Sequence, residues 1–595
     1  MCGICGVFGA GDRAVVDTML DTLRHRGPDD SHIVSGRDFV IGARRLSIVD
    51  VAGGRQPLTN EDGTIIAAQN GELYNFPDVR AALLERGHQL TTRADTEIVP
   101  HLWEEYGEDL PKQIDGMFAV AVWDSNRRVG LLARDRMGKK PLYYWRHAGA
   151  LYFASELKAL LAIPGFERRL NLEALHHYLS YKHVPHPFTI FSDVWILPPA
   201  HQLVYRPGTE PAISRYWGLS FAPANDSSRD EHEVVDELLT LLRRAVRRRF
   251  MSDVPVGFFL SGGIDSSLTT ALAAEVAPAP VKTFTLTYGG LSTTAGKEED
   301  RRWARWVATR YGTEHHEETI SVDDYPASLR RILRAFDEPF AGVVSTYFLS
   351  QRIAQHVKVA VAGDGADELF GSYRSHRIAA GAEPRPSDCS EPDWQWRARL
   401  FVMSDEEKTE LYSPDVRSAL NGVSTREHLR DAFASATAAD PLNRMLEAEF
   451  RGIFPDQVLT FIDRLSMAHS LEVRSAFLDT DVVEYVAALP GSMKIHNGET
   501  KYVLKRAAAR YFPDEMIRRP KEGFLMPVTE WVLADLQPWV RQTLSAERLA
   551  LHGLFDQQRV NEIVDQLRAP GVDYRAVNKA MVLVTFQEWY EQYLS

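Results

Sequence analysis

The chain has 595 residues, of which 45% are hydrophobic and 25% are charged, and its formal net charge is −13; this acidic balance argues against a nucleic-acid partner held by a broad basic surface. No run approaches the roughly 18 consecutive apolar residues of a membrane span. The three cysteines, Cys2, Cys5 and Cys389, are too few for a disulfide framework, and their spacing offers no tetrahedral metal site. We therefore expect a cytoplasmic protein of several domains, because one core rarely serves a chain of this length.

The first predicted strand begins with a cysteine directly after the initiator methionine. If Met1 is removed, Cys2 carries both a thiol nucleophile and an α-amine, whose reference pKa of about 8 lets it act as a base near neutrality. A cysteine in a strand is ordinarily a small buried hydrophobe. The terminal position favours the catalytic interpretation instead.

The N-terminal part alternates between strand and helix patterns. Helices are predicted at 15–23, 77–86 and 96–106, and strands at 39–45, 65–69, 118–123, 129–133 and 142–145. Strands, then helices, then strands indicate two packed sheets with helices outside.

Five short motifs follow one another along this part. They are Met-Cys-Gly-Ile at the start, RHRGPD at 24–29, RLSIVD at 45–50, NGELYN at 70–75 and RADTE at 93–97. Together they resemble the glutaminase domain of class II amidotransferases, an αββα sandwich with an N-terminal nucleophile. The resemblance implies that Cys2 attacks the side-chain amide of glutamine, forms a glutamyl thioester and liberates ammonia.

The same resemblance implies roles for five further residues. Asn70 and the Gly71 N–H would form an oxyanion hole, whose donors face charge that appears only in the tetrahedral intermediate. Arg45, Glu72 and Asp95 would hold glutamine, and Arg45 suits an α-carboxylate while Asp95 suits an α-ammonium. Local roles are also open, since Asn70-Gly71 is a good hairpin turn and Asp95 a good helix N-cap.

A polar stretch interrupts the periodic pattern in the middle of the chain. We place the inter-domain linker at 217–230, between a glutaminase domain at 1–216 and a second domain at 231–595. The second domain opens with a predicted helix at 231–250. Its basic run at 243–249 lies in an amphipathic pattern and is interpreted as a solvated helix face.

The stretch Ser261–Ser267, SGGIDSS, follows a predicted strand at 254–260 and precedes a predicted helix at 268–274. Its backbone N–H groups and hydroxyls would face an anion, so the loop is predicted to bind phosphate. It lacks the length and the lysine of the Walker pattern, and it resembles the pyrophosphate loop of ATP pyrophosphatases. An ordinary glycine-rich turn is the alternative. The predicted ATP-binding residues are Ser261, Gly262, Gly263, Asp265, Ser266 and, from the next cluster, Gly363.

That next cluster, at 362–371, follows an apolar strand predicted at 357–362. Alternating strands and helices predict a doubly wound parallel sheet with its ligand at the carboxyl ends of the strands. Carboxylates beside a triphosphate require a cation, and Mg²⁺ prefers one or two carboxylates plus phosphate oxygens. Asp265 and Asp367 are the predicted Mg²⁺ ligands, and a solvated acidic loop is the alternative.

The C-terminal part is predicted to be helical and carries DRLSMAHSLEVRSAFLD at 463–479 and RPKEGF at 519–524. With these motifs the second domain resembles the synthetase domain of glutamine-hydrolysing asparagine synthetases, an ATP-pyrophosphatase fold, and the resemblance covers nearly the whole chain. It implies that ATP adenylates the side chain of aspartate and that ammonia displaces AMP.

The resemblance also assigns two catalytic residues. Lys521 would stabilise the charge of both half-reactions, and Asp364 would act in adenylate formation and ammonia deprotonation, although better-known members have Glu there. Two sites in one chain further suggest an internal ammonia channel, because free ammonia is largely protonated at neutral pH. The family is usually dimeric, so the resemblance leaves a homodimer open, and the sequence does not determine the oligomeric state.

The segment 337–347 departs from the family pattern. Val343 and Val344 stand where relatives usually have a longer, polar stretch, and Ala476 replaces a usual proline. If the segment lines the acceptor pocket, an apolar wall would disfavour free aspartate, whose charged groups need partners. The acceptor is therefore aspartate or another carboxylate, such as one on a natural product or a cell-surface sugar. A non-catalytic relative would show an eroded motif, and none is eroded.

Overall fold

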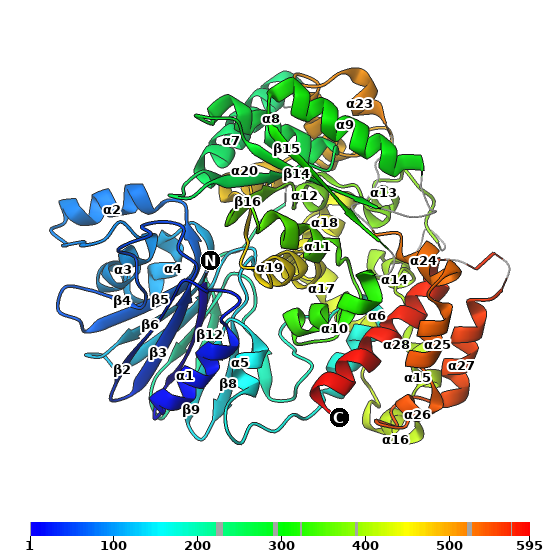
Figure 1. Cartoon of the computed structure of the whole chain (residues 1–595), viewed down its shortest axis with the longest axis horizontal. Coiled ribbons are helices and arrows are strands. Elements are labelled where there is room, and N and C mark those ends of the chain that lie inside the picture. The colour runs from blue at the N-terminus through cyan, green and yellow to red at the C-terminus, as the bar shows by residue number, and fades with distance from the viewer. Residues whose placement is uncertain are drawn as a thin grey trace.

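The computed structural model describes residues 2–221, 230–288, 295–321, 324–386, 391–519, 526–569, 571–572 and 574–595. Cys389 and the predicted catalytic Lys521 lie outside the described residues, as does most of the predicted linker at 217–230. The N-terminal strands form one body, beside which the rest of the chain is packed (Figure 1).

Two six-stranded sheets make up the N-terminal part. The first has the order β10 (Val194–Ile196), β8 (Tyr143–His147), β9 (Ala150–Ala154), β1 (Cys2–Phe8), β3 (Phe39–Arg45), β2 (Asp30–Gly36). The second has the order β12 (Ala212–Arg215), β11 (His201–Tyr205), β7 (Val129–Arg134), β6 (Gly116–Asp124), β5 (Ile65–Leu73), β4 (Leu58–Thr59). The predicted strands are confirmed, with small differences at their ends.

The sheets face each other across an aromatic core. Phe8 lies at ring-centroid distances of 5.5 Å from Trp123 and 5.0 Å from Phe153, and all three side chains are buried. The helix α1 (Arg13–Thr22) packs on the first sheet, and α2 (Phe76–Glu85) and α3 (Ile98–Tyr106) pack on the second. The predicted αββα sandwich is therefore confirmed.

A five-stranded sheet organises the second part. Its order is β15 (Glu314–Ile320), β14 (Lys282–Tyr288), β13 (Val256–Phe259), β16 (Val359–Ala362), β17 (Glu472–Ser475), and every neighbouring pair is parallel. The helices α7 (Glu231–Arg249), α8 (Ile264–Val276) and α9 (Ala295–Tyr311) lie on one side, and α11 (Ser345–Ile353) and α19 (Thr460–Met467) on the other (Figure 1). This is the predicted doubly wound sheet.

Two local expectations differ from the structure. The helix predicted at 268–274 begins earlier, at Ile264, so Asp265 and Ser266 lie in its first turn. The basic run at 243–249 is not wholly a solvated face, because Arg249 is 1% exposed and pairs with the equally buried Asp479. An arginine at this position of α7 faces the body of the protein, where a carboxylate compensates its charge.

The remaining chain is mostly helical. Its helices are η3 (Phe454–Leu459), α10 (Asp324–Phe336), α12 (Ala366–Phe370), α13 (Arg374–Ala379), α14 (Asp393–Ala398), α15 (Asp405–Leu411), α16 (Pro414–Ala419), α17 (Thr425–Ala434), α18 (Pro441–Arg451), α20 (Thr480–Ala487), α21 (Gly491–Lys494), α22 (Tyr502–Ala508), α23 (Asp514–Arg518), α24 (Val528–Ala534), α25 (Gln537–Thr543), α26 (Ala546–Leu549), α27 (Gln557–Gln566) and α28 (Tyr574–Tyr593).

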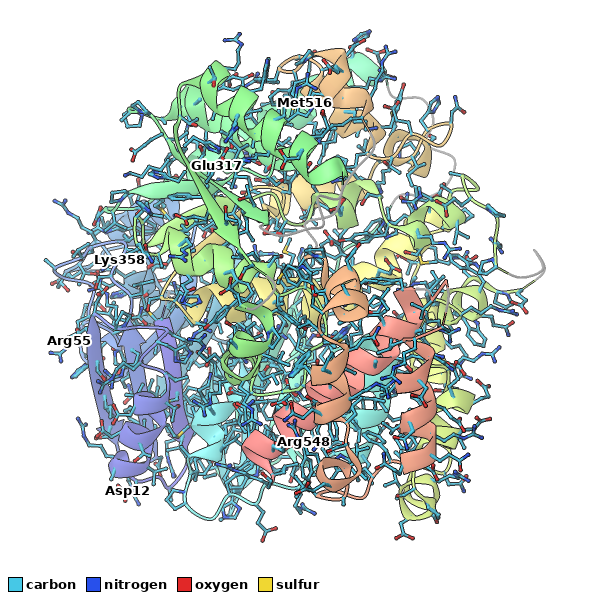
Figure 2. All side chains as sticks on the ribbon, turned by 45° about the vertical axis from the view of Figure 1, so that its right-hand side comes forward. Asp12, Arg55, Glu317, Lys358, Met516 and Arg548 are labelled. Carbon is cyan, nitrogen blue, oxygen red and sulfur yellow. The ribbon has the colours of Figure 1, made fainter. Side chains whose placement is uncertain are left out.

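The long helix α28 is held at both faces. Arg548 of α26, labelled in Figure 2, pairs with Glu588 at 2.7 Å and with Glu591 at 2.6 Å. On the inner face the Trp589 indole N–H donates to the carbonyl of Asp337 at 2.9 Å. Of the helices in the described ranges, none combines the length and apolar character needed to cross a bilayer.

Candidate active sites

Cys2 opens β1 and is 5% exposed. Its backbone N–H donates to Asn70 Oδ1 at 3.3 Å, and Gln56 Nε2 lies 3.6 Å from its Sγ. Burial raises the pKa of the Cys2 thiol above its ordinary value, while the nearby charge of Arg45 acts in the opposite direction. A buried thiol of this kind needs a base before it can act as a nucleophile.

Asn70 and Gly71 lie within β5, so the alternative hairpin-turn role is wrong. Asn70 is fully buried, and its Nδ2 has no hydrogen-bond partner among the described residues. Gly71 has a φ of +145°, and a Cβ there would lie 1.8 Å from the carbonyl oxygen of Met117. The structure thus brings an unpaired amide donor beside Cys2, at a position where the next residue must be glycine.

The three predicted glutamine-binding side chains are buried around the same strands. The Arg45 guanidinium donates to the carbonyls of Val49 at 2.9 Å and Asp50 at 2.6 Å, which fix its direction. Arg45 is also the residue opposite Cys2 in the β1–β3 register.

Asp95 is the first residue of η1 (Asp95–Glu97), not its N-cap. Its Oδ2 accepts from Gln69 Nε2 at 2.6 Å and from the Leu73 N–H at 2.9 Å. Glu72 Oε2 pairs with Arg474 at 2.9 Å, whereas its buried Oε1 has no hydrogen-bond partner in the described part of the chain. Burial, followed by the charge of Asp95, raises the pKa of Glu72, so the two carboxylates lie near each other.

The SGGIDSS loop joins β13 to α8. Ser261 Oγ lies 3.0 Å from Ser266 Oγ, which brings the two hydroxyls together at the helix start. Gly262 has a φ of +79° and packs against Asp300, where a Cβ would lie 2.0 Å from the backbone carbonyl. The loop therefore needs glycine both for its backbone conformation and for this close approach.

The second predicted cluster lies directly beside this loop, because β16 pairs with β13. A Cβ on Gly363 would lie 3.0 Å from the backbone nitrogen of Ser266. A cavity of about 880 Å³ opens at the carboxyl ends of both strands. Its lining includes all but Gly262 of the residues predicted to bind ATP or metal there: Ser261, Gly263, Asp265, Ser266, Gly363 and Asp367.

Lys501 was not found by sequence analysis, although it lies at the centre of this site. Its Nζ lies 2.5 Å from Asp265 Oδ2 and 2.7 Å from Asp367 Oδ1. The ammonium group of this lysine therefore lies between the two predicted Mg²⁺ ligands. The buried Asp265 Oδ1 has no hydrogen-bond partner among the described residues. The paired carboxylates and the unpaired oxygen suit a hard divalent cation.

Asp364 also lines the cavity. Burial, with a smaller contribution from the charges of Asp367 and Asp265, raises the pKa of Asp364 to about 7. Asp364 borders a second cavity of about 20 Å³ as well, together with Tyr74 and Met117 of the sandwich. That volume is enough for roughly one water-sized molecule.

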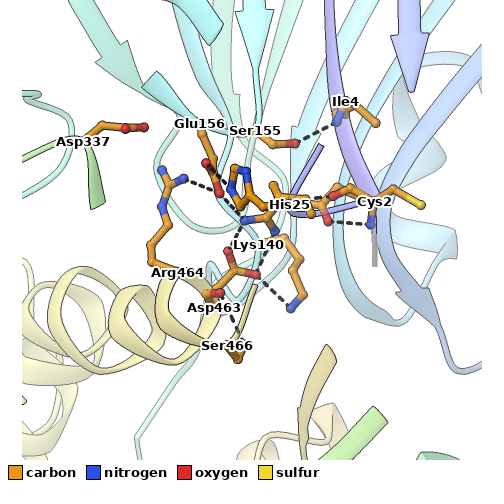
Figure 3. A network of polar contacts seen from close by, with 12 residues as sticks. Cys2, Ile4, His25, Lys140, Ser155, Glu156, Asp337, Asp463, Arg464 and Ser466 are labelled. Carbon is orange, nitrogen blue, oxygen red and sulfur yellow. Dashed lines mark hydrogen bonds and ion pairs between the residues drawn. The ribbon is translucent and has the colours of Figure 1, made fainter. Parts of the chain in front are cut away.

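A polar network joins the two parts of the chain next to Cys2 (Figure 3). The Arg26 Nε donates to the Cys2 carbonyl at 3.2 Å, and its two terminal nitrogens donate to the Asp463 carboxylate of α19 at 2.8 and 3.1 Å. Lys140 reaches the same carboxylate at 3.2 Å, and Arg464 lies 3.1 Å from Glu156. The motifs at 24–29 and 463–479 thus meet at one buried interface.

Gln56 is a second residue that the sequence did not indicate. Its Nε2 faces Cys2 Sγ while its Oε1 accepts from the Gln69 N–H at 2.7 Å. Neither Gln56 nor Lys501 lies in any of the motifs quoted above, so no local signal marked them. Only the fold brings them to the site.

Comparisons with known proteins cover nearly all of the chain. A family model described as asparagine synthase matches residues 237–591, and one described as glutamine amidotransferase domain matches residues 1–217. The glutamine-hydrolysing asparagine synthetases 1 and 3 of Bacillus subtilis (strain 168) are both 32% identical to the chain; the alignments cover 91% and 95% of this chain and 90% and 93% of theirs. The amidase chry2 of Gibberella zeae is 28% identical, over 92% of this chain and 90% of its own.

Proposed function

The chain belongs to the glutamine-hydrolysing asparagine synthetase family and is an ATP-dependent ligase that takes nitrogen from glutamine, and we propose that it converts aspartate to asparagine. In this proposal Cys2 hydrolyses glutamine, the second site adenylates the acceptor carboxylate, and ammonia completes the reaction there. The observation that carries the proposal is Asp364, a carboxyl group with a pKa of about 7 that borders both the large cavity and the small cavity beside the sandwich.

Glutamine hydrolysis begins with the deprotonation of Cys2. Once Met1 is removed, the α-amine of the same residue takes the thiol proton, because burial disfavours the thiolate. Sγ then attacks the amide carbon, and the oxyanion accepts hydrogen bonds from Asn70 Nδ2 and the Gly71 N–H. The amine returns the proton to the leaving ammonia, and water later cleaves the thioester to give glutamate.

Glutamine is oriented by charge. Arg45 receives the α-carboxylate and Asp95 the α-ammonium, since the charges of these two buried side chains act on the Cys2 thiol. Glu72, buried near Asp95, adds negative charge on the side of the α-ammonium. The guanidinium is held in place by two backbone carbonyls, so little ordering is needed when the substrate binds.

The SGGIDSS loop holds the pyrophosphate portion of ATP through its N–H groups and hydroxyls, and the start of α8 adds favourable partial charge. Asp265 and Asp367 would hold Mg²⁺, which supplies positive charge to the phosphate oxygens. Lys501 places its ammonium group between these carboxylates, where it adds positive charge beside the phosphate groups. Lys521, outside the described residues, would stabilise the developing charge.

Asp364 acts where the two half-reactions meet. With a pKa of about 7, its carboxylate is ionised near neutral pH and can accept the proton that the attacking ammonia nitrogen releases. Ammonia attacks the adenylated carbonyl, its nitrogen loses a proton to Asp364, the bond from the carbonyl carbon to the phosphate oxygen breaks, and AMP leaves. The small cavity beside Asp364, Tyr74 and Met117 lies on the side of the sandwich, which supports an internal route for ammonia.

One observation favours an acceptor other than aspartate. Val343 and Val344, which replace polar residues of the family pattern, both line the large cavity. An apolar wall leaves the charged groups of free aspartate without partners. Amidation of a different, less charged carboxylate is therefore the alternative function.

An acceptor screen distinguishes the two functions. Pyrophosphate and AMP are measured with ATP, Mg²⁺ and glutamine while the carboxylic acid is varied. Release of both products that requires aspartate, with asparagine formed in equal amount, supports the first function. Release that requires another acid and not aspartate overturns it in favour of the second.

A further inference from the structure

Glu61, His88, His101 and Glu104 form a cluster that the proposed reaction does not use. Glu61 lies in the turn between β4 and β5, His88 follows α2, and His101 and Glu104 share one face of α3. These elements lie together at the outer side of the sandwich (Figure 1). One ligand atom from each of the four side chains lies within 4.8 Å of all the others, so three chain segments converge on one point.

The spacings are close to those of a tetrahedral metal site. His101 Nδ1 lies 3.3 Å from Glu61 Oε2 and 3.6 Å from Glu104 Oε2, and His88 Nδ1 lies 3.4 Å and 3.6 Å from the same two carboxylates. Zinc binds imidazole nitrogen and carboxylate oxygen at about 2.0–2.1 Å, which puts tetrahedral ligands roughly 3.3–3.4 Å apart. The four His–Glu distances are close to this value, with Glu61 facing His101 through Oε2 and His88 through Oε1. All four groups lie within 4.8 Å of one another, so rotation of the exposed Glu61 side chain would let one ion contact all of them.

His101 provides an independent sign of a ligand. It is 1% exposed, and neither ring nitrogen has a hydrogen-bond partner in the described residues. Leaving a buried polar group unpaired is costly.

Neighbouring groups orient the other ligands. His88 Nε2 lies 3.1 Å from Glu105 Oε1, an interaction that fixes the proton on Nε2 and leaves Nδ1 free to bind. Glu104 Oε1 accepts from Asn60 Nδ2 at 3.0 Å, and Glu61 Oε1 accepts from the Gln89 N–H at 2.8 Å. Such outer contacts are typical of built metal sites.

We propose that Glu61, His88, His101 and Glu104 bind a single zinc-type divalent ion. Two imidazole donors favour zinc over magnesium or calcium, which prefer oxygen ligands. The ion would hold both ends of the segment 88–101, which contains Asp95, and would join it to the β4–β5 turn. Its role is to stabilise this part of the sandwich, since all four positions are filled by protein.

Metal binding is tested on the full chain with zinc itself. Protein dialysed first against Zn²⁺ and then against metal-free buffer should retain about one zinc ion per chain by mass spectrometry. His88→Asn and Glu104→Gln should each lower retention at least about 10-fold, because each removes one of four ligands. His147→Asn, at an exposed histidine of β8, is the matched control and should retain as much zinc as the unaltered chain.

Cobalt gives a readout of the geometry. The chain loaded with Co²⁺ should show the strong visible absorption of a tetrahedral ion, and His88→Asn should abolish it. Retention by the unaltered chain no greater than that of His88→Asn, or only the weak absorption of octahedral cobalt, would overturn the proposal. The test uses Glu104→Gln and not a change at His101, because the Glu104 side chain is 32% exposed whereas His101 is buried. Replacement of the partly exposed Glu104 should leave the fold intact.

Discussion

The guanidinium of Arg26 and the carboxylate of Asp463 form a two-point ion pair, at 2.8 and 3.1 Å, between the sandwich and α19. Both side chains are buried, and Arg26 also donates to the carbonyl of the proposed nucleophile Cys2. The contact therefore links the backbone of one proposed active site to a helix of the other part. Removal of either partner should destabilise the folded protein, because the buried charge that remains loses a compensating charge and is not solvated by water.

Asp463→Asn should destabilise the protein by about 3–5 kcal/mol, the usual cost of leaving a buried charge uncompensated. Lys140 would lose the one carboxylate that it pairs with in the described residues, whereas Arg26 would keep its pair with Glu156 at 2.7 Å. The free energy of unfolding is measured by urea titration of the full chain. Glu210→Gln, which breaks an exposed pair with Arg146, is the control and should cost no more than about 1 kcal/mol. Equal losses in the two variants would contradict the prediction.

The same ion pair predicts a direction for the pH dependence of stability. Burial alone would raise the pKa of Asp463, but the charges of Arg26 and Lys140 hold it below its ordinary value. The contribution of the ion pair to the free energy of unfolding is therefore fully present above the unfolded-state pKa of Asp463, about 3.9. It is lost as the pH falls toward the lower pKa of Asp463 in the folded protein. Acid titrations should show this loss in the unaltered chain, and its absence in Asp463→Asn would confirm the assignment.

Glutamine use should depend on Cys2, while ammonia use should not. Cys2→Ala removes the proposed nucleophile and should abolish glutamine hydrolysis but preserve product formation from added ammonia. Asn70→Ala should lower hydrolysis by about 10²–10³-fold, the usual cost of one oxyanion donor. Cys5→Ala, another buried thiol of β1, is the control and should leave hydrolysis unchanged. Loss of the ammonia-driven reaction in Cys2→Ala would show that the two sites are not separable.

Asp265→Asn should have the opposite effect. The variant keeps the shape of the side chain but removes charge from the proposed Mg²⁺ site, so pyrophosphate release should fall on the order of 10²-fold or more. Glutamine hydrolysis should continue. Asp236→Asn, at an exposed position of α7, is the matched control. Unimpaired pyrophosphate release in Asp265→Asn would remove this residue from the proposed site.

Sequence patterns predicted the elements whose signals are local. The strand expected at 39–45 is β3 with the same bounds, and the adjacent strands β13 and β16 bring their two loops together as βαβ logic requires. The start of α8 was placed too late, because the glycines and serines at 261–267 have turn propensity. The helix begins directly after Gly263, and no side chain caps its first turn, so the first N–H groups remain available to a ligand.

Partners far apart in the chain could not be predicted. Arg26 and Asp463 are 437 residues apart, and Lys501 and Asp265 are 236 apart. A lone lysine or arginine in a sequence is ordinarily a solvent-exposed residue. Only the packing of α19 and the start of α22 against the sheets determines which carboxylate each one meets.

Ligation should lose rate as the pH falls through about 7. Asp364 must be ionised to accept a proton, and burial with nearby carboxylates raises the pKa of Asp364 to about 7. Initial rates of AMP formation are measured at a constant concentration of free ammonia, so that protonation of ammonia itself does not contribute. Asp364→Glu should retain this acidic limb, whereas Asp364→Asn should be slow at every pH. An unchanged profile in the Asn variant would exclude Asp364 as the base.

Val343→Thr should improve the use of aspartate. Val343 lines the large cavity, and a hydroxyl of nearly the same shape could donate one hydrogen bond to a charged acceptor. A hydrogen bond to a charged group is worth about 1.5–3 kcal/mol, so the KM for aspartate should fall at least roughly 10-fold, with little change in kcat. Val276→Thr, at the end of α8, is the matched control and should leave the KM unaltered. A KM for aspartate that does not change in Val343→Thr would show that this wall does not determine the acceptor.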